Sequence, residues 1–575
     1  MTRKYVLGIN GWFEGSHDSS AILMEFNNDS QAKIIAGLEE EKVLGKKGVF
    51  DIFPKESAKT VIEIAGIVPE ELSAIVIGWD YPLIYKTMNK KFDISSEKII
   101  SEIFPNEACL DVPLIFVNHH VAHANSAHFA STFEKSLSLV IDGNGELEST
   151  SLWKYENNTR EFLESYSPIS SFGFLFEATN TMLGFRENES GKTMGLAGYG
   201  KPKYVSKILD YFDNSISPSK KLKRIYNKFA SANKTNLLMP YQETCIKMWR
   251  YIFEYELGIE PLKVKLSSFY EIPEDLKDLA SSVQKVLEVK VLNYIDNKTK
   301  ELGIRNITIS GGVGLNCILN GEILELENVD NIFVQPAAGD SGVALGAAIE
   351  YGYQNNYNCN IEKFSPYIGK EYLDVEIKNF LIDNNIPFIE VSDASEKISQ
   401  FIKNDEVIAV FQGRNEWGPR ALGNRTILSL PSDGKLDFIN KYVKCRELGR
   451  PLAPSMLVND LDVLMNNSPK ILSKYMNVAH EATKKNKGVS SIIHVDNTFR
   501  PQCVLKEENS IYFTQLEKVK ENNDISILIN TSFNADTPII YNLKSAIEFM
   551  ESRYIDKVVF NNKFIVSRNS VCTKI

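Results

Sequence analysis

The sequence has no apolar run of membrane-spanning length, and its cysteines are few and scattered. A membrane helix needs about 18 consecutive apolar residues, and no segment approaches that length. The seven cysteines never form a C-x-x-C pair, which excludes a zinc knuckle or a disulfide framework. We expect reduced thiols in a reducing compartment, most of them small core residues. They are Cys109, Cys245, Cys317, Cys359, Cys445, Cys503 and Cys572.

A secretion signal and an excess of positive charge are also absent. The start, MTRKYVLGIN, has no apolar core region and no small-residue cleavage site, so we expect a cytoplasmic protein. The net charge of −10 argues against a general nucleic-acid or membrane-surface binder, although a local basic pocket for a small anion is compatible with it. The 575 residues, 43% of them hydrophobic and 24% charged, predict a soluble globular protein of two or more domains.

Histidine is rare, yet four of the seven histidines lie in residues 117–128, VNHHVAHANSAH. In a helix, positions i and i+4 lie on one face about 5–6 Å apart at Cβ. His119 and His123 could therefore bind one metal ion, whereas His120 would point elsewhere. The alternative is an exposed polar helix that happens to be rich in histidine.

Two stretches near the amino terminus share one plan. KYVLGINGWFEGSHDSSAILM and LSLVIDGNGELESTSLW each consist of an apolar run, a turn at Asn10-Gly11 or Asp142-Gly143, and a second apolar run. Each predicts a β-hairpin whose loop could hold phosphate or metal. Asn-Gly and Asp-Gly are common turn formers, so one copy would mean little, but two copies indicate a duplicated domain.

Two further glycine-rich segments each follow an apolar strand and lead into a predicted helix. In ITISGGVGLNCILNGEIL, Gly311, Gly312 and Gly314 would allow a ligand to approach the backbone, and the helix start favours an anion or a nucleotide. The pattern is not G-x-G-x-x-G, so a dinucleotide fingerprint is not supported. In VQPAAGDSGVALGAAIEYG, Asp340 lies in the turn.

Residues 356–370, polar and without clear periodicity, are expected to link two domains. Beyond them, basic residues gather in loops after predicted strands, as a pocket for a phosphorylated substrate requires, since arginine binds phosphate through two parallel hydrogen bonds. Surface solubility is the alternative for any one of them. They are Arg414, Arg420, Arg425, Lys444, Arg446, Arg450 and Arg500.

Across nearly the whole chain, the motifs HHVAHANSA, SGGVGLN, GDSGVALGAA, GRNEWGPRALGNRTIL, VKCRELGRPLAPS and LINTSFN resemble those of the O-carbamoyltransferases, which include nodulation-factor and antibiotic-tailoring enzymes. The resemblance implies an α/β fold of two fused domains. Residues 1–355 would form an actin/Hsp70-like carbamoyl-transfer domain. Residues 371–575 would form a domain similar to threonylcarbamoyl-AMP synthase (YrdC-like).

The resemblance also implies the chemistry. The second domain would make carbamoyl-adenylate from carbamoyl phosphate and Mg²⁺-ATP, releasing pyrophosphate. The first would transfer the carbamoyl group to a hydroxyl of a small natural product or sugar, releasing AMP. A divalent metal, iron in those family members where it has been identified, would lie between His119, His123, Asp142 and Asp340. Two imidazoles and two carboxylates independently suit Fe²⁺, Mn²⁺ or Zn²⁺.

Candidate residues for each step follow from the resemblance. His17 would be the general base for the acceptor hydroxyl, since its ordinary pKa lies near neutral pH. Asp18 either orients His17 or caps a turn. The reacting phosphates would be held by Lys444, Arg420, Arg450 and Arg500. Arg414 and Arg425 are the next candidates, although one of these two could brace the loop. Gly311, Gly312, Asn316 and Lys192 would contact nucleotide.

One motif departs from the family pattern. Many members carry an arginine shortly after NTSFN, where this chain has Asp536. An acid cannot replace an arginine at an anion site, so only Asn530 and Asn534 are retained as binding candidates there. Glu39, Glu40 and Glu41 also match a family pattern, with a solvated strand edge as the alternative.

Other functions remain to be distinguished. An actin-fold small-molecule kinase would share the hairpins and glycine loops but would release ADP. A tRNA-threonylcarbamoylating enzyme would share the chemistry, although the negative charge disfavours an RNA partner. A non-enzymatic scaffold would not need these acids, histidines and arginines. We expect no nucleic-acid or membrane partner, and a homodimer is compatible with the sequence. The acceptor is not identified, and residues 207–240 are expected to line its pocket.

Overall fold

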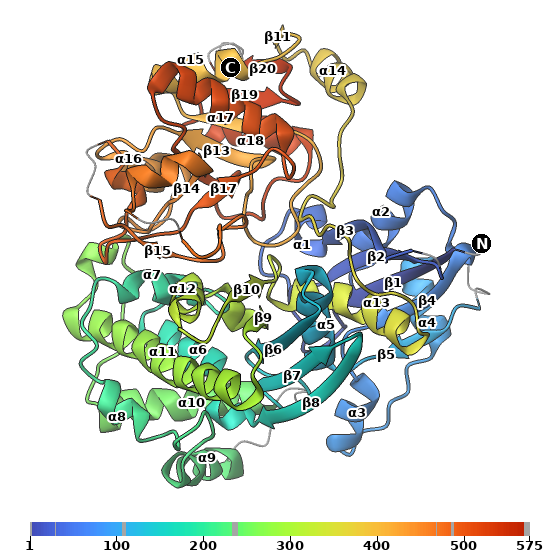
Figure 1. Ribbon diagram of the computed structural model, residues 1–575, viewed down its shortest axis with the longest axis vertical. Helices are drawn as coiled ribbons and strands as arrows, with labels where there is room; N and C mark the ends of the chain where they lie inside the picture. The colour runs from blue at the N-terminus through green and yellow to red at the C-terminus, as the bar shows by residue number, and fades with distance from the viewer. Residues whose placement is uncertain are drawn as a thin grey trace. The chain divides into compact units, whose positions relative to one another are not determined.

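The computed structural model describes residues 3–28, 30–105, 111–232, 240–466, 469–484 and 488–568 (Figure 1). The chain divides into two compact units. The first unit comprises residues 1–44, 48–265 and 272–364, and the second comprises residues 45–47, 266–271 and 365–575. The change at Phe364/Ser365 falls inside the stretch 356–370 that the sequence marks as a linker.

The first sheet of the first unit has five strands in the order β3-β2-β1-β4-β5. β1 (Lys4–Asn10) is antiparallel to β2 (Ser20–Phe26) and parallel to β4 (Leu72–Ile77). β3 (Lys33–Glu39) is antiparallel to β2, and β5 (Leu114–Phe116) is parallel to β4. The β1–β2 pair is the first hairpin predicted from the sequence.

The second sheet repeats this pattern in the order β10-β9-β6-β7-β8. β6 (Lys135–Ile141) is antiparallel to β7 (Thr150–Glu156) and parallel to β9 (Asn306–Ser310). β8 (Thr159–Tyr166) is antiparallel to β7, and β10 (Asn331–Val334) is parallel to β9. Both sheets thus have the same strand order and the same strand directions, as a duplicated domain requires.

Two helices occupy corresponding places in the repeats and lie side by side (Figure 1). α5 (His119–Ser131) follows β5, and α13 (Val343–Gln354) follows β10. Small residues allow their backbones to touch, because a Cβ added to Gly346 would lie 1.6 Å from the carbonyl oxygen of Ala122. Every residue of α5 is buried. The alternative of an exposed histidine-rich helix is therefore wrong.

The remaining helices of the first unit cover the sheets and fill the chain between β8 and β9. They are α1 (Glu40–Leu44), α2 (Lys55–Ala65), α3 (Tyr81–Thr87), α4 (Ser96–Ile103), α6 (Phe172–Met182), α7 (Ser190–Ala197), α8 (Val205–Leu209), α9 (Lys220–Ala232), α10 (Pro240–Tyr251), α11 (Glu274–Leu302) and α12 (Cys317–Glu325). The expected acceptor segment 207–240 contains α9 and the end of α8, and its residues 233–239 lie outside the described residues.

The second unit is built on an eight-stranded mixed sheet in the order β11-β20-β19-β12-β13-β18-β14-β17. Its strands are β11 (Ile389–Glu390), β12 (Ile408–Phe411), β13 (Arg425–Ser429), β14 (Ala453–Leu457), β17 (Gln502–Val504), β18 (Leu528–Ser532), β19 (Lys557–Phe560) and β20 (Phe564–Ser567). A separate antiparallel pair joins β15 (His480–Glu481) and β16 (Thr498–Phe499).

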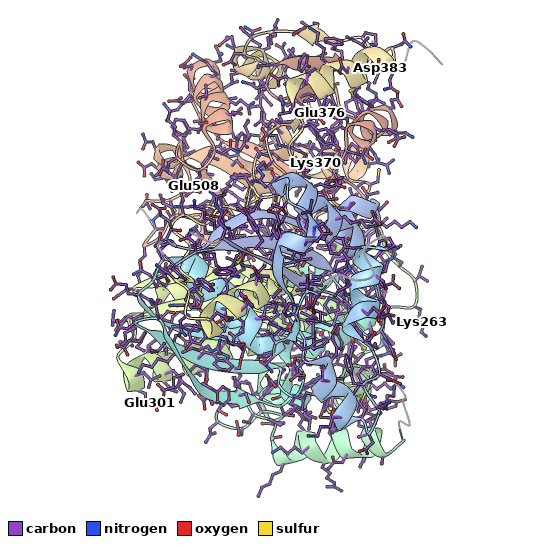
Figure 2. All side chains as sticks on the ribbon, turned by 90° about the vertical axis from the view of Figure 1, so that its right-hand side faces the viewer. Lys263, Glu301, Lys370, Glu376, Asp383 and Glu508 are labelled. Carbon is purple, nitrogen blue, oxygen red and sulfur yellow. The ribbon has the colours of Figure 1, made fainter. Side chains whose placement is uncertain are left out.

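Helices cover both faces of this sheet. In β12, Ala409 and Phe411 pack into one apolar cluster, while Ile408 and Val410 pack into another, because strand side chains alternate. α14 (Asp374–Asp383) and α18 (Leu543–Ser552) contribute to the first cluster, and α15 (Ser395–Lys403) and α17 (Ser510–Asn523) contribute to the second. Glu376 and Asp383 mark α14 in Figure 2. The short α16 (Lys435–Phe438) follows β13. The fold is thus mixed α/β, as expected.

The stretch 356–370 is packed rather than loose. Ile361 and Phe364 are buried in the first unit, where the Ile361 N–H donates to the Phe129 carbonyl at 3.1 Å. In the second unit, the Gly369 N–H donates to the Asn415 carbonyl at 3.0 Å. The five described cysteines are free thiols, as expected, and Cys109 and Cys572 lie outside the described residues. Among the described helices, none combines the length and apolar character needed to cross a membrane.

Candidate metal centre and anion-binding cluster

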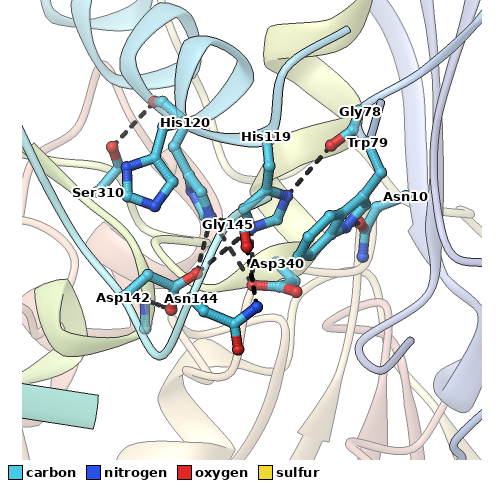
Figure 3. Close-up of polar contacts among 12 residues, drawn as sticks. Asn10, Gly78, Trp79, His119, His120, Asp142, Asn144, Gly145, Ser310 and Asp340 are labelled. Carbon is cyan, nitrogen blue, oxygen red and sulfur yellow. Dashed lines mark hydrogen bonds and ion pairs between the residues drawn. The ribbon is translucent and has the colours of Figure 1, made fainter. Parts of the chain in front are cut away.

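The structure brings together the four residues predicted to bind a metal. His119 and His123 lie in the first turns of α5, Asp142 directly follows β6, and Asp340 opens the short 3₁₀ helix η6 (Asp340–Gly342) after β10 (Figure 3). One donor atom from each lies within 4.8 Å of the other three, and all four side chains are buried. The Nε2 atom of His119 is 3.3 Å from Asp142 Oδ2 and 3.6 Å from Asp340 Oδ1.

Contacts behind His119 fix its orientation. Its Nδ1 lies 3.1 Å from the carbonyl oxygen of Gly78, which can only accept, so Nδ1 donates and Nε2 faces the donor set. The indole of Trp79 stacks on the ring with 3.7 Å between centroids (Figure 3). His123 is held differently: among the described residues its buried Nδ1 has no hydrogen-bond partner, while its carbonyl accepts from the hydroxyl of Ser310 at 2.9 Å.

The glycine pair after β9 orients Asp142. The Gly312 N–H donates to Asp142 Oδ1 at 2.9 Å, which leaves Oδ2 facing the histidines. Gly311 has a φ of +87°, and a Cβ there would lie 2.2 Å from the carbonyl oxygen of Ile141. Only glycine fits this contact. The pair therefore has a structural task at the metal centre, and its contact with nucleotide stays a prediction.

The charges of the cluster favour a cation. Burial alone would lower the pKa of His119, but Asp340 and Asp142 outweigh burial and raise that pKa to about 10. Burial alone would raise the pKa of Asp142, but the histidines hold it well below its usual range. The Nε2 atoms of His119 and His123 face each other at 3.1 Å, so a proton or a cation must lie between them. Two imidazoles and two carboxylates thus fit a divalent metal of the Fe²⁺, Mn²⁺ or Zn²⁺ type.

His17 and Asp18 lie beside this centre, in the loop between β1 and β2. His17 Nε2 is 3.9 Å from Asp340 Oδ2, and His17 Nδ1 is 3.3 Å from Asp18 Oδ2. The His17 side chain is 38% exposed, unlike the four buried donors. Burial lowers the pKa of His17, but Asp340 and Asp18 outweigh it and raise that pKa to about 10. At 3.3 Å, the Asp18 carboxylate contacts the His17 imidazole, as a residue that orients His17 would.

Several residues that build the centre were missed by sequence reasoning. The Asn10 side-chain amide donates to the carbonyls of His17 and Asp18 at 3.1 and 3.2 Å, and its oxygen accepts from the Trp79 indole at 3.1 Å. The carboxylate of Glu146 accepts from the His119 N–H at 3.0 Å. Burial raises the pKa of Glu146 to about 7. The only sequence signal for Glu146 was its place in the glycine-rich turn after Asp142.

Glu146 also binds the residues around the start of α5. It accepts from the Asp80 N–H at 2.7 Å and from the Asn118 amide at 2.8 Å, and Asn118 itself caps the helix. An acid at a helix amino terminus is stabilised by the free N–H groups and the helix dipole. Glu146 therefore fixes the turn that carries His119.

The other histidines of the run are core residues. His120 Nδ1 bonds the hydroxyl of Ser151 at 2.8 Å, and His128 Nδ1 bonds that of Ser136 at 2.8 Å. Burial lowers the pKa of His128 to about 3. Neither residue was among the predicted metal ligands, and neither belongs to the four-donor group in the structure.

Some candidates for nucleotide binding have structural partners instead. Asn316 caps α12 by accepting from the Leu319 N–H at 3.0 Å, and its amide donates to Gln284 at 2.8 Å. Lys192 is buried and forms an ion pair with Glu189 at 2.7 Å. Their contact with nucleotide stays a prediction.

The acids Glu39, Glu40 and Glu41 do not form a solvated edge. Glu39 is buried and pairs with Lys42 at 2.8 Å, and Glu40 is buried and accepts from the Ser57 N–H at 2.7 Å. Burial, followed by the charge of Asp18, raises the pKa of the partly buried Glu41 to about 7. The solvated alternative is therefore wrong.

In the second unit, Arg414 and Arg425 both brace loops. Arg425 is fully buried, donates to the carbonyls of Gln412, Asn424 and Gly413 at 2.6, 3.0 and 3.1 Å, and stacks on Phe411. Burial lowers its pKa to about 10.

Arg414 donates to the carbonyls of Ile368 and Gly369 at 2.7 and 2.8 Å. Glu416, missed in the sequence, accepts from the N–H groups of Leu422, Asn424 and Arg425 at 2.8, 2.8 and 3.1 Å. Bracing by one arginine was foreseen, but two arginines do so. Arg420 lies half-buried in the same motif.

Four other cations gather in what we call the cationic cluster: Lys444, Arg446, Arg450 and Arg500. Burial, followed by the charges of Arg446, Lys47 and Arg450, holds the pKa of Lys444 well below its usual range. Burial, followed by the charges of Arg450 and Arg500, does the same for Arg446. These effects require the cations to lie near one another.

The members of the cationic cluster differ in their partners. Lys444 Nζ donates to the Ser532 carbonyl and to Asn534 Oδ1, each at 2.6 Å. Arg450 lies 3.6 Å from the Glu447 carboxylate. Arg500 is half-buried and has no hydrogen-bond or ion-pair partner in the described part of the chain. A half-buried arginine without a partner, beside like charges, is suited to an anion.

The two candidates in the motif NTSFN, which spans the end of β18, have structural partners, and their contact with a ligand stays a prediction. Asn530 is buried in the sheet, where its amide donates to Ser455 and Gln502 at 2.7 and 2.9 Å. The side-chain oxygen of Asn534 accepts from Lys444 Nζ. Asp536 lies close enough to raise the pKa of Lys444, against the larger effects of burial and neighbouring cations.

The comparisons with known proteins identify the family. The family model Carbamoyltransferase N-terminus matches residues 87–349, and Carbamoyltransferase C-terminus matches residues 399–568. The chain belongs to the carbamoyltransferase family.

The chain is 28% identical to nodulation protein NolNO of Sinorhizobium fredii over 98% of this chain and 83% of that protein. It is 30% identical to nodulation protein NolO of Bradyrhizobium diazoefficiens over 77% of each. It is 32% identical to 3'-hydroxymethylcephem-O-carbamoyltransferase of Streptomyces clavuligerus over 44% of this chain and 47% of that enzyme. The protein is thus a carbamoyltransferase, as the motifs predicted.

Proposed function

We propose that this carbamoyltransferase is ATP-dependent and acts on a hydroxyl group. Its second unit would join carbamoyl phosphate to ATP, giving carbamoyl-adenylate and pyrophosphate. Its first unit would transfer the carbamoyl group to a hydroxyl of a small natural product or sugar and release AMP. The observation that carries this proposal is the presence of two separate polar centres, one in each unit: a four-donor metal site and a cationic cluster.

The architecture supports the same division. We assign the first unit to the actin/Hsp70-like class because two sheets of identical topology each present hairpin and helix termini to one centre. We assign the second unit to the YrdC-like class from the family resemblance and its mixed sheet with helices on both faces. Adenylate formation needs positive charge around the reacting phosphates, because most of the barrier is electrostatic. Arg500, Arg450, Lys444 and Arg420 would supply that charge, with Mg²⁺ accompanying ATP.

In the transfer step, an acceptor hydroxyl oxygen attacks the carbamoyl carbon while the bond from that carbon to the AMP phosphate oxygen breaks. His17 takes the hydroxyl proton, and Asp18 holds the imidazole by their contact. His119, His123, Asp142 and Asp340 would hold the metal, Fe²⁺ by the family resemblance. A bound divalent ion would polarise a carbonyl or phosphate oxygen and would offset the carboxylate charge that otherwise keeps His17 protonated.

A product assay tests this proposal. The purified protein is incubated with Mg²⁺-ATP and carbamoyl phosphate, and pyrophosphate, AMP and ADP are measured. We expect pyrophosphate that depends on carbamoyl phosphate, and AMP once a hydroxyl acceptor is present. Release of ADP with phosphorylation of the acceptor would instead establish a kinase. A screen of hydroxyl-bearing natural products for the mass of one added carbamoyl group would then identify the acceptor.

A further inference from the structure

A polar cavity of about 400 Å³ opens in the first unit at the carboxyl-terminal end of α5. Gln31, the segment Thr132–Glu134, the turn Asn157–Asn158 and residues 360–362 line it, together with His128. Pockets that bind small molecules start at about 300 Å³. The cavity is therefore large enough for a compact ligand such as a monosaccharide.

The polar groups around this cavity lack protein partners. The side chains of Gln31, Glu134, Asn157 and Glu362 form no hydrogen bond or ion pair with any described residue. Their neighbours differ: the Asn360 amide donates to the Asn158 side-chain oxygen at 3.3 Å. Four unpaired acceptors and donors around one hollow could all bind the same ligand.

His128 is the buried member of the lining. It is only 3% exposed and stacks on Tyr155 with 4.1 Å between ring centroids. Its Nδ1 is occupied by the Ser136 hydroxyl, whereas Nε2 has no hydrogen-bond partner among the described residues. The imidazole of His128 is largely buried and lines the cavity with one nitrogen unused, so it offers a fixed polar contact to a ligand.

The composition of the lining selects the ligand. Neither lysine nor arginine is among the described lining residues, whereas two carboxylates, Glu134 and Glu362, are. An anion would be repelled, while hydroxyl and ammonium groups can donate to the carboxylates and to the amide oxygens. Phe133 offers an apolar face next to them. We propose that this cavity binds an uncharged or cationic polyhydroxylated molecule, a hexose or an amino hexose.

This cavity is separate from the metal centre. His128 lies nine residues beyond His119 in one helix, which corresponds to about 13 Å along the axis. The helix between them is buried throughout. A ligand at this cavity therefore occupies a second site, at the opposite end of the helix that carries two of the metal donors.

Binding can be measured on the full chain by saturation-transfer NMR and calorimetry with D-glucosamine, D-glucose and glucose 6-phosphate. We expect D-glucosamine to bind more tightly than D-glucose, and glucose 6-phosphate not to bind. Glu134→Gln and Glu362→Gln should each weaken D-glucosamine binding about tenfold, the effect of one charge-assisted hydrogen bond. Both positions are exposed and the substitutions conserve shape, so the fold should persist.

Glu301→Gln is the matched control, because Glu301 is an exposed acid of the first unit that does not line the cavity (Figure 2). We expect it to leave D-glucosamine affinity unchanged. A Glu134→Trp variant should block both sugars by filling the entrance. The proposal is overturned if neither sugar binds the native protein, if the double Gln variant binds D-glucosamine as well as the native protein does, or if glucose 6-phosphate binds as tightly as D-glucosamine.

Discussion

The two repeats of the first unit have one topology but different chemistry at corresponding loops. At the end of β1, Asn10 uses its amide to hold the carbonyls of His17 and Asp18, so its task is to shape a loop. After β6, Asp142 turns a carboxylate oxygen toward the histidine pair. A neutral amide and an anionic ligand thus occupy matching turns, and this single change of side chain separates loop building from metal binding.

The loops after β4 and β9 also correspond to each other and also contribute different groups. After β4, the Gly78 carbonyl accepts from His119, and after β9 the Gly312 N–H donates to Asp142. Each repeat thus uses a glycine backbone group to orient a donor. The helix after β5 provides the two imidazoles, and the turn after β10 provides the carboxylate of Asp340. Each repeat supplies two ligands, so neither repeat could bind the metal alone.

The largest expected effect tests whether both repeats supply ligands to one metal. His119→Ala or His123→Ala should abolish metal binding and slow carbamoyl transfer about a thousandfold, the loss expected when about 4 kcal/mol of charge stabilisation is removed. Metal content by elemental analysis and transfer rate are the measurements.

His120→Gln is the matched control, because His120 is the neighbouring buried histidine and bonds Ser151 instead. The control should retain the metal. Loss of metal in the control as well would show that the helix is disturbed and that the donor set is wrong.

The next effect concerns the first hairpin loop. His17→Asn should lower transfer about 10²-fold, the lower end of what a general base contributes. Metal content and pyrophosphate release should stay at native values, since His17 is neither a donor nor part of the second unit. Separate assays of the two half-reactions check this, and a simultaneous loss of both would contradict the assignment.

Two arginines of the second unit show the same contrast between a residue that builds a loop and a residue that binds a ligand. Arg425→Ala should lower the free energy of unfolding by about 3 kcal/mol or more, because it leaves several buried carbonyls unpaired. Arg500→Ala should change stability by about 0.5 kcal/mol or less and raise the KM for carbamoyl phosphate about tenfold. Denaturant unfolding and initial rates give the two values. Equal destabilisation by both variants would show that Arg500 is structural.

Spacing together with the family resemblance was sufficient for the metal ligands but not for the residues that support them. His119 and His123 are one helical turn apart, and Asp142 and Asp340 lie in turns that follow strands, so local pattern and family motifs together named all four residues. Glu146 and Asn10 escaped because their partners are backbone groups from other elements, and no spacing records such contacts. The repeated hairpins were visible because strand, turn and strand are contiguous in the chain.

The arginine-rich motif shows the opposite limit. Charge alone could not distinguish Arg425, which is fully buried on carbonyls, from Arg500, which has no described partner. Burial of a cation is decided by the loop that Glu416 organises, and that loop closes only in the folded sheet. Residue type therefore predicted that cations gather in the second unit, and only tertiary contacts distinguished the bracing arginines from the one without a described partner.

The smallest expected effect concerns Glu146, which supports His119 but is not itself one of the four ligands. Glu146→Gln keeps an acceptor for the His119 N–H but removes the charge at the start of α5. We expect about tenfold weaker metal binding, as for other residues that orient a ligand, and about 1 kcal/mol less stability. Competition with a chromophoric chelator and thermal unfolding are the two measurements.

Glu148→Gln is the control, because Glu148 contacts Asn118 at 3.2 Å but not His119. A lower stability with unchanged metal affinity would reduce Glu146 to a helix cap, whereas a joint loss, absent in the control, would show that the cap positions the ligand.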